Sequence, residues 1–69
     1  MVYLTPKEME LMKNLAKGYD NKRIADIMCI TTDTVKAHLT SILRKFDVTN
    51  RTEAVIYAIK YKVIPIEEL

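Results

Sequence analysis

Signals that start and stop helices divide this chain of 69 residues into short segments. Thr5 and Glu8 have the spacing of a capping box, and Asn50 and Glu53 repeat that spacing toward the end of the chain. Gly18 is the only glycine, and it follows the first segment, where a left-handed residue commonly ends a helix. No segment of usable length reads as a strand. The chain is therefore predicted to be all-α.

Apolar residues recur at helical spacing between these signals. We expect four helices, over residues of about 6–17, 21–28, 32–46 and 51–62. The second would be capped by Asp20, and the fourth would end ahead of Pro65. Only three or four residues join the second helix to the third, which is typical of a helix-turn-helix. Residues 1–69 are predicted to form one compact domain of this kind.

The composition excludes several classes of protein. Apolar residues are 49% of the chain, too many for disorder, and the longest uncharged run is far below the ~20 residues of a membrane span. One cysteine, Cys29, and one histidine, His38, provide neither a multi-cysteine zinc site nor a nucleophile beside a base. We expect a cytoplasmic protein that is not an enzyme and has no metal, cofactor or small-molecule ligand.

The third predicted helix has one apolar and one polar face. Val35 belongs to the apolar face, whose residues fall within ~100° of one another around the helix. The opposite, polar side holds Asp33, Ala37, Thr40, Ser41 and Arg44, flanked by Lys36. Of these, Lys36, Ala37, Thr40 and Arg44 are predicted to point outward. In a helix-turn-helix such a face enters the major groove, where a lysine can donate to guanine and an alanine can contact a thymine methyl. The alternative is a solvated face on an ordinary bundle helix.

The fourth predicted helix carries more apolar residues than one buried face requires. We assign Ala54, Val55, Ala58 and Tyr61 to the core. A second stripe then remains, formed by Ile56, Ile59, Lys60 and Val63. A leftover apolar stripe on a small domain commonly marks a contact, and we expect a homodimer interface here. The alternative is that residues 64–69 fold back over the stripe.

Six short motifs match, in order and spacing, the LuxR-type helix-turn-helix domain, also called NarL or GerE. They are Leu4-Thr5-Pro6-Lys7-Glu8, Leu15-Ala16-Lys17-Gly18-Tyr19, Asn21-Lys22-Arg23-Ile24-Ala25, Thr34-Val35-Lys36-Ala37-His38, Ile42-Leu43-Arg44-Lys45-Phe46 and Asn50-Arg51-Thr52-Glu53-Ala54. The chain resembles this family from Leu4 to about Ile64. The resemblance implies a DNA-binding domain of bacterial transcription regulators, either the C-terminal effector domain of a response regulator or a stand-alone regulator.

The resemblance also implies roles for individual residues. The expected base contacts are Lys36, Ala37 and Thr40. The expected backbone contacts are Arg44 and Lys45, together with Thr34 and His38, which either contact the backbone or brace the reading helix. To these we add Lys22, Arg23 and Arg51 as sources of phosphate neutralisation. The implied partners are double-stranded DNA, a second copy of the chain through the fourth helix, and RNA polymerase. The alternative function is a protein-interaction module that contacts polymerase or another regulator with the same surface.

Three residues depart from the family's pattern. Asp33 begins the reading face where Lys or Arg is frequent, and its carboxylate would repel phosphate or favour a cytosine amino group. Arg23 stands where a capping Glu is usual. Asp47 follows the third helix where Gly or Asn is frequent, and Asp adopts the left-handed conformation less readily than Gly.

Overall fold

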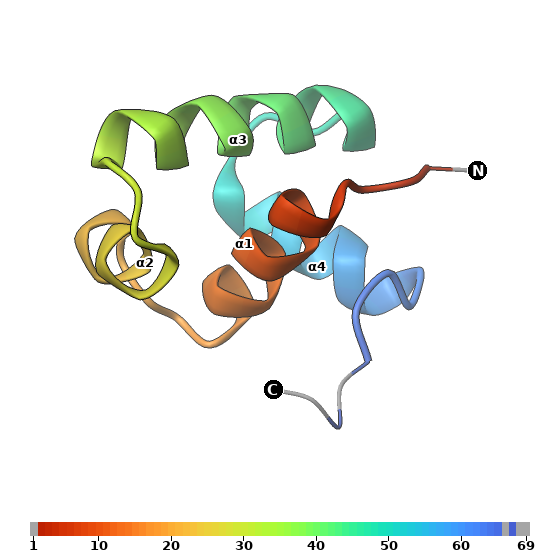
Figure 1. Cartoon of the computed structure of the whole chain (residues 1–69). Helices are drawn as coiled ribbons and strands as arrows, with labels where there is room; N and C mark the ends of the chain where they lie inside the picture. Colours follow the sequence, from red (N-terminus) through yellow and green to blue (C-terminus); the bar gives the residue numbers. More distant parts are fainter. Residues whose placement is uncertain (1, 66, 68–69) are drawn as a thin grey trace.

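The computed structural model describes residues 2–65 and 67, and it consists of four helices joined by short connections (Figure 1). The helices are α1 (Pro6–Ala16), α2 (Asn21–Met28), α3 (Thr32–Phe46) and α4 (Arg51–Lys60). No strand occurs in this part of the chain. The predicted all-α helix-turn-helix fold is confirmed. The predicted boundaries hold for α2 and α3, whereas α1 ends one residue earlier and α4 two residues earlier than expected.

A side chain caps the start of every helix. Thr5 accepts a hydrogen bond from the backbone N–H of Glu8, and the Glu8 carboxylate accepts one from the N–H of Thr5, which completes the predicted capping box of α1. At α4 the Asn50 side chain accepts from the N–H of Glu53, and the Glu53 carboxylate accepts from the N–H of Thr49 at 3.0 Å. Hydrogen bonds from Thr49 lower the pKa of the Glu53 carboxyl.

The end of every helix is followed by a residue in the left-handed conformation. These residues are Gly18, Cys29, Asp47 and Lys62, with φ of 85°, 57°, 56° and 56°. At each one, the next residue donates its N–H back to a carbonyl five positions earlier, as Val63 does to Ala58 at 2.8 Å. Because Lys62 turns the chain in this way, α4 stops at Lys60 instead of continuing.

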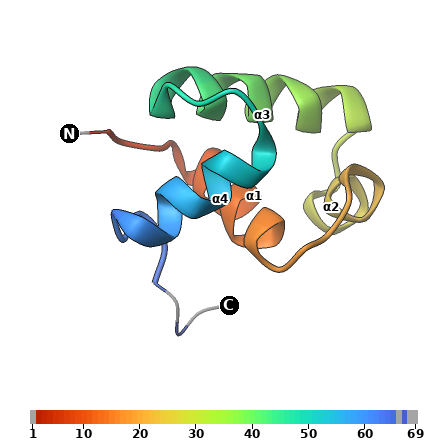
Figure 2. The same ribbon diagram turned by 180° about the vertical axis from the view of Figure 1, so that it is seen from behind.

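One apolar core is shared by all four helices. It consists of Leu11, Met12, Leu15, Ile24, Ala25, Met28, Val35, Ile42, Phe46, Ala54, Ala58 and Ile64. In Figure 1, α3 lies across the top of the molecule, α2 lies near one end of it, and α1 and α4 lie below. Figure 2 shows the same layers from behind, with α4 nearest the viewer. This arrangement leaves one long side of α3 uncovered.

The prediction that Tyr61 is a core residue is wrong. Tyr61 is 59% exposed, because α4 has already ended and the ring leans against Tyr57 from outside, with 4.6 Å between ring centroids. Tyr57 in turn stacks on Phe46 at 4.3 Å. After the turn at Lys62, Ile64 enters the core and is 1% exposed. The alternative that residues 64–69 cover the stripe on α4 falls partly on residues 66, 68 and 69, which lie outside the described residues.

The left-handed turn at Cys29 predicts that glycine stabilises this position. A side chain with a Cβ is strained there, so Cys29→Gly should raise the free energy of unfolding by about 0.5–1 kcal/mol after the extra chain entropy of glycine is subtracted. Cys29→Ser keeps the Cβ and should change little. Urea unfolding of the three proteins measures the difference, and equal stability of the glycine and serine variants would contradict the argument.

Candidate nucleic-acid interface

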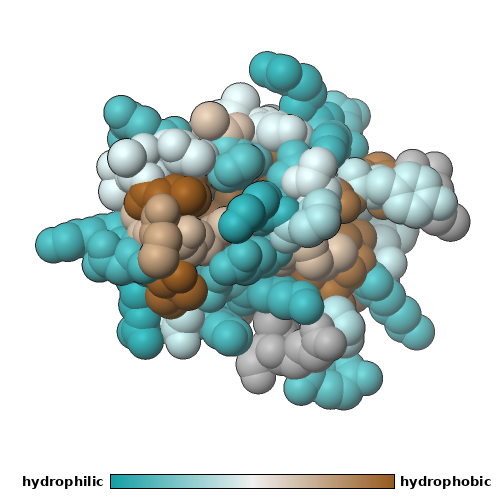
Figure 3. Space-filling model, viewed as in Figure 1, coloured by the Kyte–Doolittle hydropathy of each residue, from teal (hydrophilic) through white to brown (hydrophobic). Residues whose placement is uncertain are grey.

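The helix-turn-helix is formed by α2, the connection at residues 29–31 and α3. Val35 is fully buried against the rest of the domain. Lys36, Ala37, Thr40 and Arg44 are all exposed on the uncovered side of α3. In the space-filling view, hydrophilic and neutral side chains cover the upper edge of the molecule, where α3 lies (Figure 3). α3 therefore presents a polar surface whose opposite face is anchored in the core.

The three residues expected to contact bases lie within little more than one turn of α3. The Thr40 hydroxyl donates to the carbonyl of Lys36 at 2.9 Å, so its lone pairs remain as acceptors toward the solvent. An acceptor there suits the amino group of cytosine or adenine. Ala37 is exposed and small, which leaves room for close approach of a base edge. Asp33 is exposed in the first turn of the same helix.

Two of the cations expected at the phosphate backbone are held by contacts with other side chains of the domain. The Arg23 guanidinium lies over the ring of Tyr19, 4.0 Å from its centroid. Arg51 donates from Nη2 to Oδ1 of Asn21 at 2.9 Å, which joins the first residue of α4 to the first residue of α2. Lys22 is exposed beside them on α2. Restraint of this kind reduces the side-chain entropy that a later ion contact would cost.

Thr34 and His38 lie one turn apart on α3, and both are half-buried. The Thr34 hydroxyl is 3.0 Å from that of Thr31, the residue that caps the helix. Both side chains therefore lie at the edge of the exposed face rather than at its centre.

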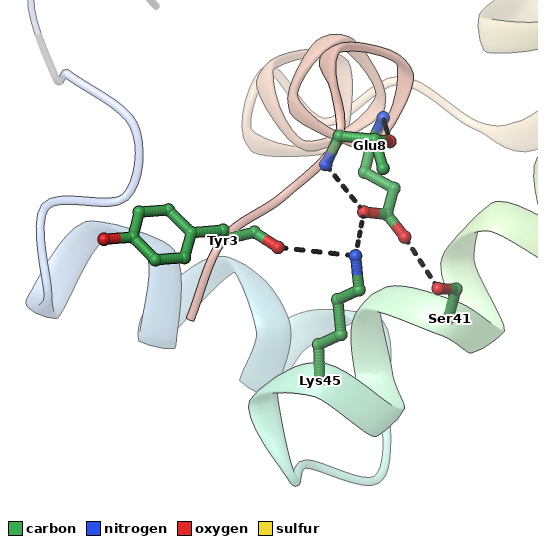
Figure 4. Close-up of polar contacts among 5 residues, drawn as sticks. Tyr3, Glu8, Ser41 and Lys45 are labelled. Carbon is green, nitrogen blue, oxygen red and sulfur yellow. Dashed lines mark hydrogen bonds and ion pairs between the residues drawn. The ribbon is translucent and has the colours of Figure 1, made fainter. Parts of the chain in front are cut away.

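Sequence reasoning missed a polar cluster between α1 and α3. We placed Ser41 on the outer face, but it is half-buried and its hydroxyl donates to Oε2 of Glu8 at 2.6 Å. The Lys45 ammonium lies 2.6 Å from Oε1 of Glu8 and donates to the carbonyl of Tyr3 at 3.3 Å (Figure 4). No spacing in the sequence indicates such pairs, because their members are 33 and 37 residues apart.

Glu8 is charged although it is only 3% exposed. Burial by itself would raise the pKa of this carboxyl. Hydrogen bonds from Lys45, Ser41 and the backbone of Thr5, together with the positive charge of Lys45, outweigh burial and lower the pKa of Glu8 to about 2. The ion pair therefore persists throughout the neutral and mildly acidic range.

The stripe expected at the dimer interface is only partly exposed to solvent. Ile56 is 58% exposed and Lys60 is exposed, whereas Ile59 and Val63 are half-buried. Ile56 lies between two surface hollows, one lined by Tyr19 and Val55 among others, and one lined by Val48, Tyr57 and Tyr61 among others. The outer side of α4 thus combines one protruding apolar side chain with two apolar recesses.

Metal-binding groups and membrane-spanning helices are both absent from the described residues. Residues 2–65 and 67 contain no group of three or more His, Cys, Asp or Glu side chains that could hold a metal ion. None of the helices in this range has the length and apolar character needed to cross a membrane.

Comparisons with known proteins agree with the motifs. The family described as "Bacterial regulatory proteins, luxR family" matches residues 2–58. Response regulator protein VraR of Staphylococcus aureus is 49% identical over 61 residues, which are 88% of this chain and 29% of that relative. The chain therefore spans less than a third of the length of the curated relatives it matches.

Two solved structures share the fold. Response regulator ChrA, from a heme-sensing two-component system, superposes with a TM-score of 0.88 and 36% identity over 93% of this chain and 32% of its own. Transcription factor GerE superposes with a TM-score of 0.80 and 27% identity over 86% of this chain and 88% of its own. The second match covers nearly all of a chain that has the same arrangement of helices.

The low pKa of Glu8 predicts how stability depends on pH. The folded pKa of about 2 lies below the ordinary glutamate value of 4.5, so the contribution of Glu8 is complete above about pH 4.5 and is lost as the pH falls toward 2. This contribution to the free energy of unfolding is about 3 kcal/mol at neutral pH. Urea unfolding between pH 7 and pH 2.5 should therefore show a shallower loss of stability in Glu8→Gln than in the parent.

The matched control is Glu10→Gln, which removes an exposed glutamate from the same helix. It should retain the pH dependence of the parent. If Glu8→Gln and Glu10→Gln gave the same profile, the Glu8 carboxylate would not be the group that stabilises the fold at neutral pH.

Proposed function

Because the chain belongs to the luxR family of bacterial regulatory proteins, we propose that it binds specific sequences of double-stranded DNA with α3 and dimerises through α4. Members of this family regulate transcription by binding DNA, and they are not enzymes.

The observation that supports sequence reading is the two-sided character of α3. Its inner residues, such as Val35 and Ile42, are fully buried, so the helix is held by one side while the other projects from the domain. Lys36, Ala37 and Thr40 lie at the centre of the projecting side and would reach base edges in the major groove. They supply a donor, an apolar contact and an acceptor, three types of readout that distinguish base pairs there.

Contacts to the phosphate backbone would supply most of the affinity. We assign this role to Lys22, Arg23, Arg44 and Arg51, with Thr34 and His38 at the edge of the reading face. If one subunit neutralises about four phosphates, the logarithm of its binding constant should fall with the logarithm of salt concentration with a slope of roughly −3.6. A module that binds only proteins would show no such salt-dependent binding to duplex DNA.

The outer side of α4 supports a two-fold dimer. In a symmetric interface the same patch meets its own copy, so each protrusion must find a recess on the partner. Ile56 provides the protrusion, and the hollows beside it provide the recesses. Lys60, Ile59 and Val63 would extend the contact along the helix. Two subunits related in this way would place two α3 helices on half-sites about one turn of DNA apart.

Substitutions on α3 should separate base reading from backbone binding. Lys36→Ala should lose about 1–3 kcal/mol of discrimination at one or two base positions. Arg44→Ala should weaken binding to all duplexes alike and reduce the salt slope by about 0.9. The test is binding of both variants to duplexes selected from a random pool and to single-base variants of them. A uniform loss in both variants would exclude Lys36 as a base reader.

The proposed dimer interface can be tested without DNA. Ile56→Asp places a charge at the centre of the contact and should leave only monomer in sedimentation equilibrium at concentrations where the parent self-associates. Ile27→Asp is the matched control, because Ile27 is a similarly exposed isoleucine, 46% against 58%, on α2. If the parent is monomeric at all concentrations, or if both variants dissociate alike, α4 is not the interface.

A further inference from the structure

We propose that Glu8 is a positioning residue for DNA reading: through Ser41 and Lys45 it fixes how α3 is rotated and inclined on the domain. The inference rests on the proposed function of α3 as the reading helix. It assigns Lys45 a role inside the domain in place of the phosphate contact that the family resemblance implies. Figure 4 shows the geometry from which it follows.

Glu8 is an anchor because its own place is fixed. Its backbone N–H and its carboxylate both take part in the capping box with Thr5, so both the backbone and the side chain of Glu8 are held in place. Oε1 accepts from the Thr5 N–H at 2.8 Å and from Lys45 at 2.6 Å, and Oε2 accepts from Ser41 at 2.6 Å. No buried side-chain polar atom in the described part of the chain lacks a partner.

Ser41 sets the rotation of α3 about its axis. Adjacent residues in an α-helix point about 100° apart. When Ser41 is bonded to Glu8, its neighbour Thr40 is therefore directed away from α1 and toward the exposed side. The apolar contacts of Val35 and Ile42 turn this side of α3 toward the core, and the directional hydrogen bond of Ser41 narrows the range of rotations that these contacts allow.

Lys45 sets the inclination of α3. It lies four residues after Ser41, so the two tethers are on the same side of the helix and one turn apart. Both converge on the same carboxylate. Lys36 lies nine residues before Lys45, or about 13 Å along the axis, so a small tilt at this end displaces the base-reading residues appreciably.

The charge of Lys45 is balanced by a contact within the domain, although its side chain remains 35% exposed. Its ammonium is shared between the Glu8 carboxylate and the carbonyl of Tyr3, and both lie toward α1 and the segment before it. Its neighbour Arg44 is exposed on the reading side. Both residues are exposed, but Lys45 is ion-paired with Glu8 and Arg44 lies on the reading side, so the two can be compared in a test.

The test compares Ser41→Ala and the double variant Glu8→Gln/Lys45→Met with Arg44→Met. The double variant removes the ion pair without leaving one buried charge unbalanced, and urea unfolding establishes that each protein is folded. Binding to a selected duplex and to random duplex is measured over a range of salt. Positioning predicts at least a tenfold loss on the selected duplex, little change on random duplex, and an unchanged salt slope for the first two variants. Arg44→Met should instead weaken binding to both duplexes and reduce the slope by about 0.9.

Two outcomes would overturn the proposal. A slope reduced by about 0.9 in the double variant, with equal loss on both duplexes, would make Lys45 a phosphate contact. Unchanged DNA binding in folded variants would mean that the cluster of Glu8, Ser41 and Lys45 only stabilises the fold.

A measurement without DNA separates this proposal from the proposed function. Residual dipolar couplings give the angle between α1 and α3 in the parent and in the same variants. A changed angle in Ser41→Ala and in the double variant supports positioning, whereas an unchanged angle rejects it. If the parent binds no duplex at any salt concentration, the proposed function fails, and the couplings still decide whether Glu8 orients α3.

Discussion

A single buried carboxylate joins the first helix of this domain to the third. Glu8 caps α1 with one set of bonds and holds Ser41 and Lys45 of α3 with another. The apolar core supplies most of the stabilisation and determines which side of each helix is buried, but its contacts are less directional than hydrogen bonds. The hydrogen bonds and the ion pair are directional. The arrangement of the exposed face of α3 relative to the body of the domain therefore depends on them.

Local signals in the sequence predict most of the fold. Thr5, Asp20 and Asn50 cap their helices as predicted, and Gly18 ends α1 in the left-handed conformation. The inner position of Val35 follows from helical spacing alone. What could not be predicted depends on contacts distant in sequence or on unusual backbone. Cys29 and Lys62 are not residue types that signal a left-handed turn, so the early end of α4 was missed.

Charge in the sequence also differs from charge at the surface. Lys45 and Arg44 look equivalent as neighbouring basic residues and both are exposed, but Lys45 is ion-paired with Glu8 whereas Arg44 lies on the outer side of α3. Helical periodicity places Ser41 on the polar face, because it cannot distinguish a polar residue in water from one bonded inside the domain. Net charge and wheel position therefore do not show which cations are ion-paired within the domain, because such pairs depend on tertiary contacts.

Every helix in this domain ends with the same left-handed turn, and the connections that result are only three or four residues long. Such connections keep successive helices side by side, so closing them costs little chain entropy. Domains in which most contacts are local in sequence are also among the fastest to fold. The contacts of Glu8 with Ser41 and Lys45 are exceptions, because they join residues more than thirty positions apart. The turns thus favour rapid formation of the helical framework, and the long-range polar contacts complete its alignment.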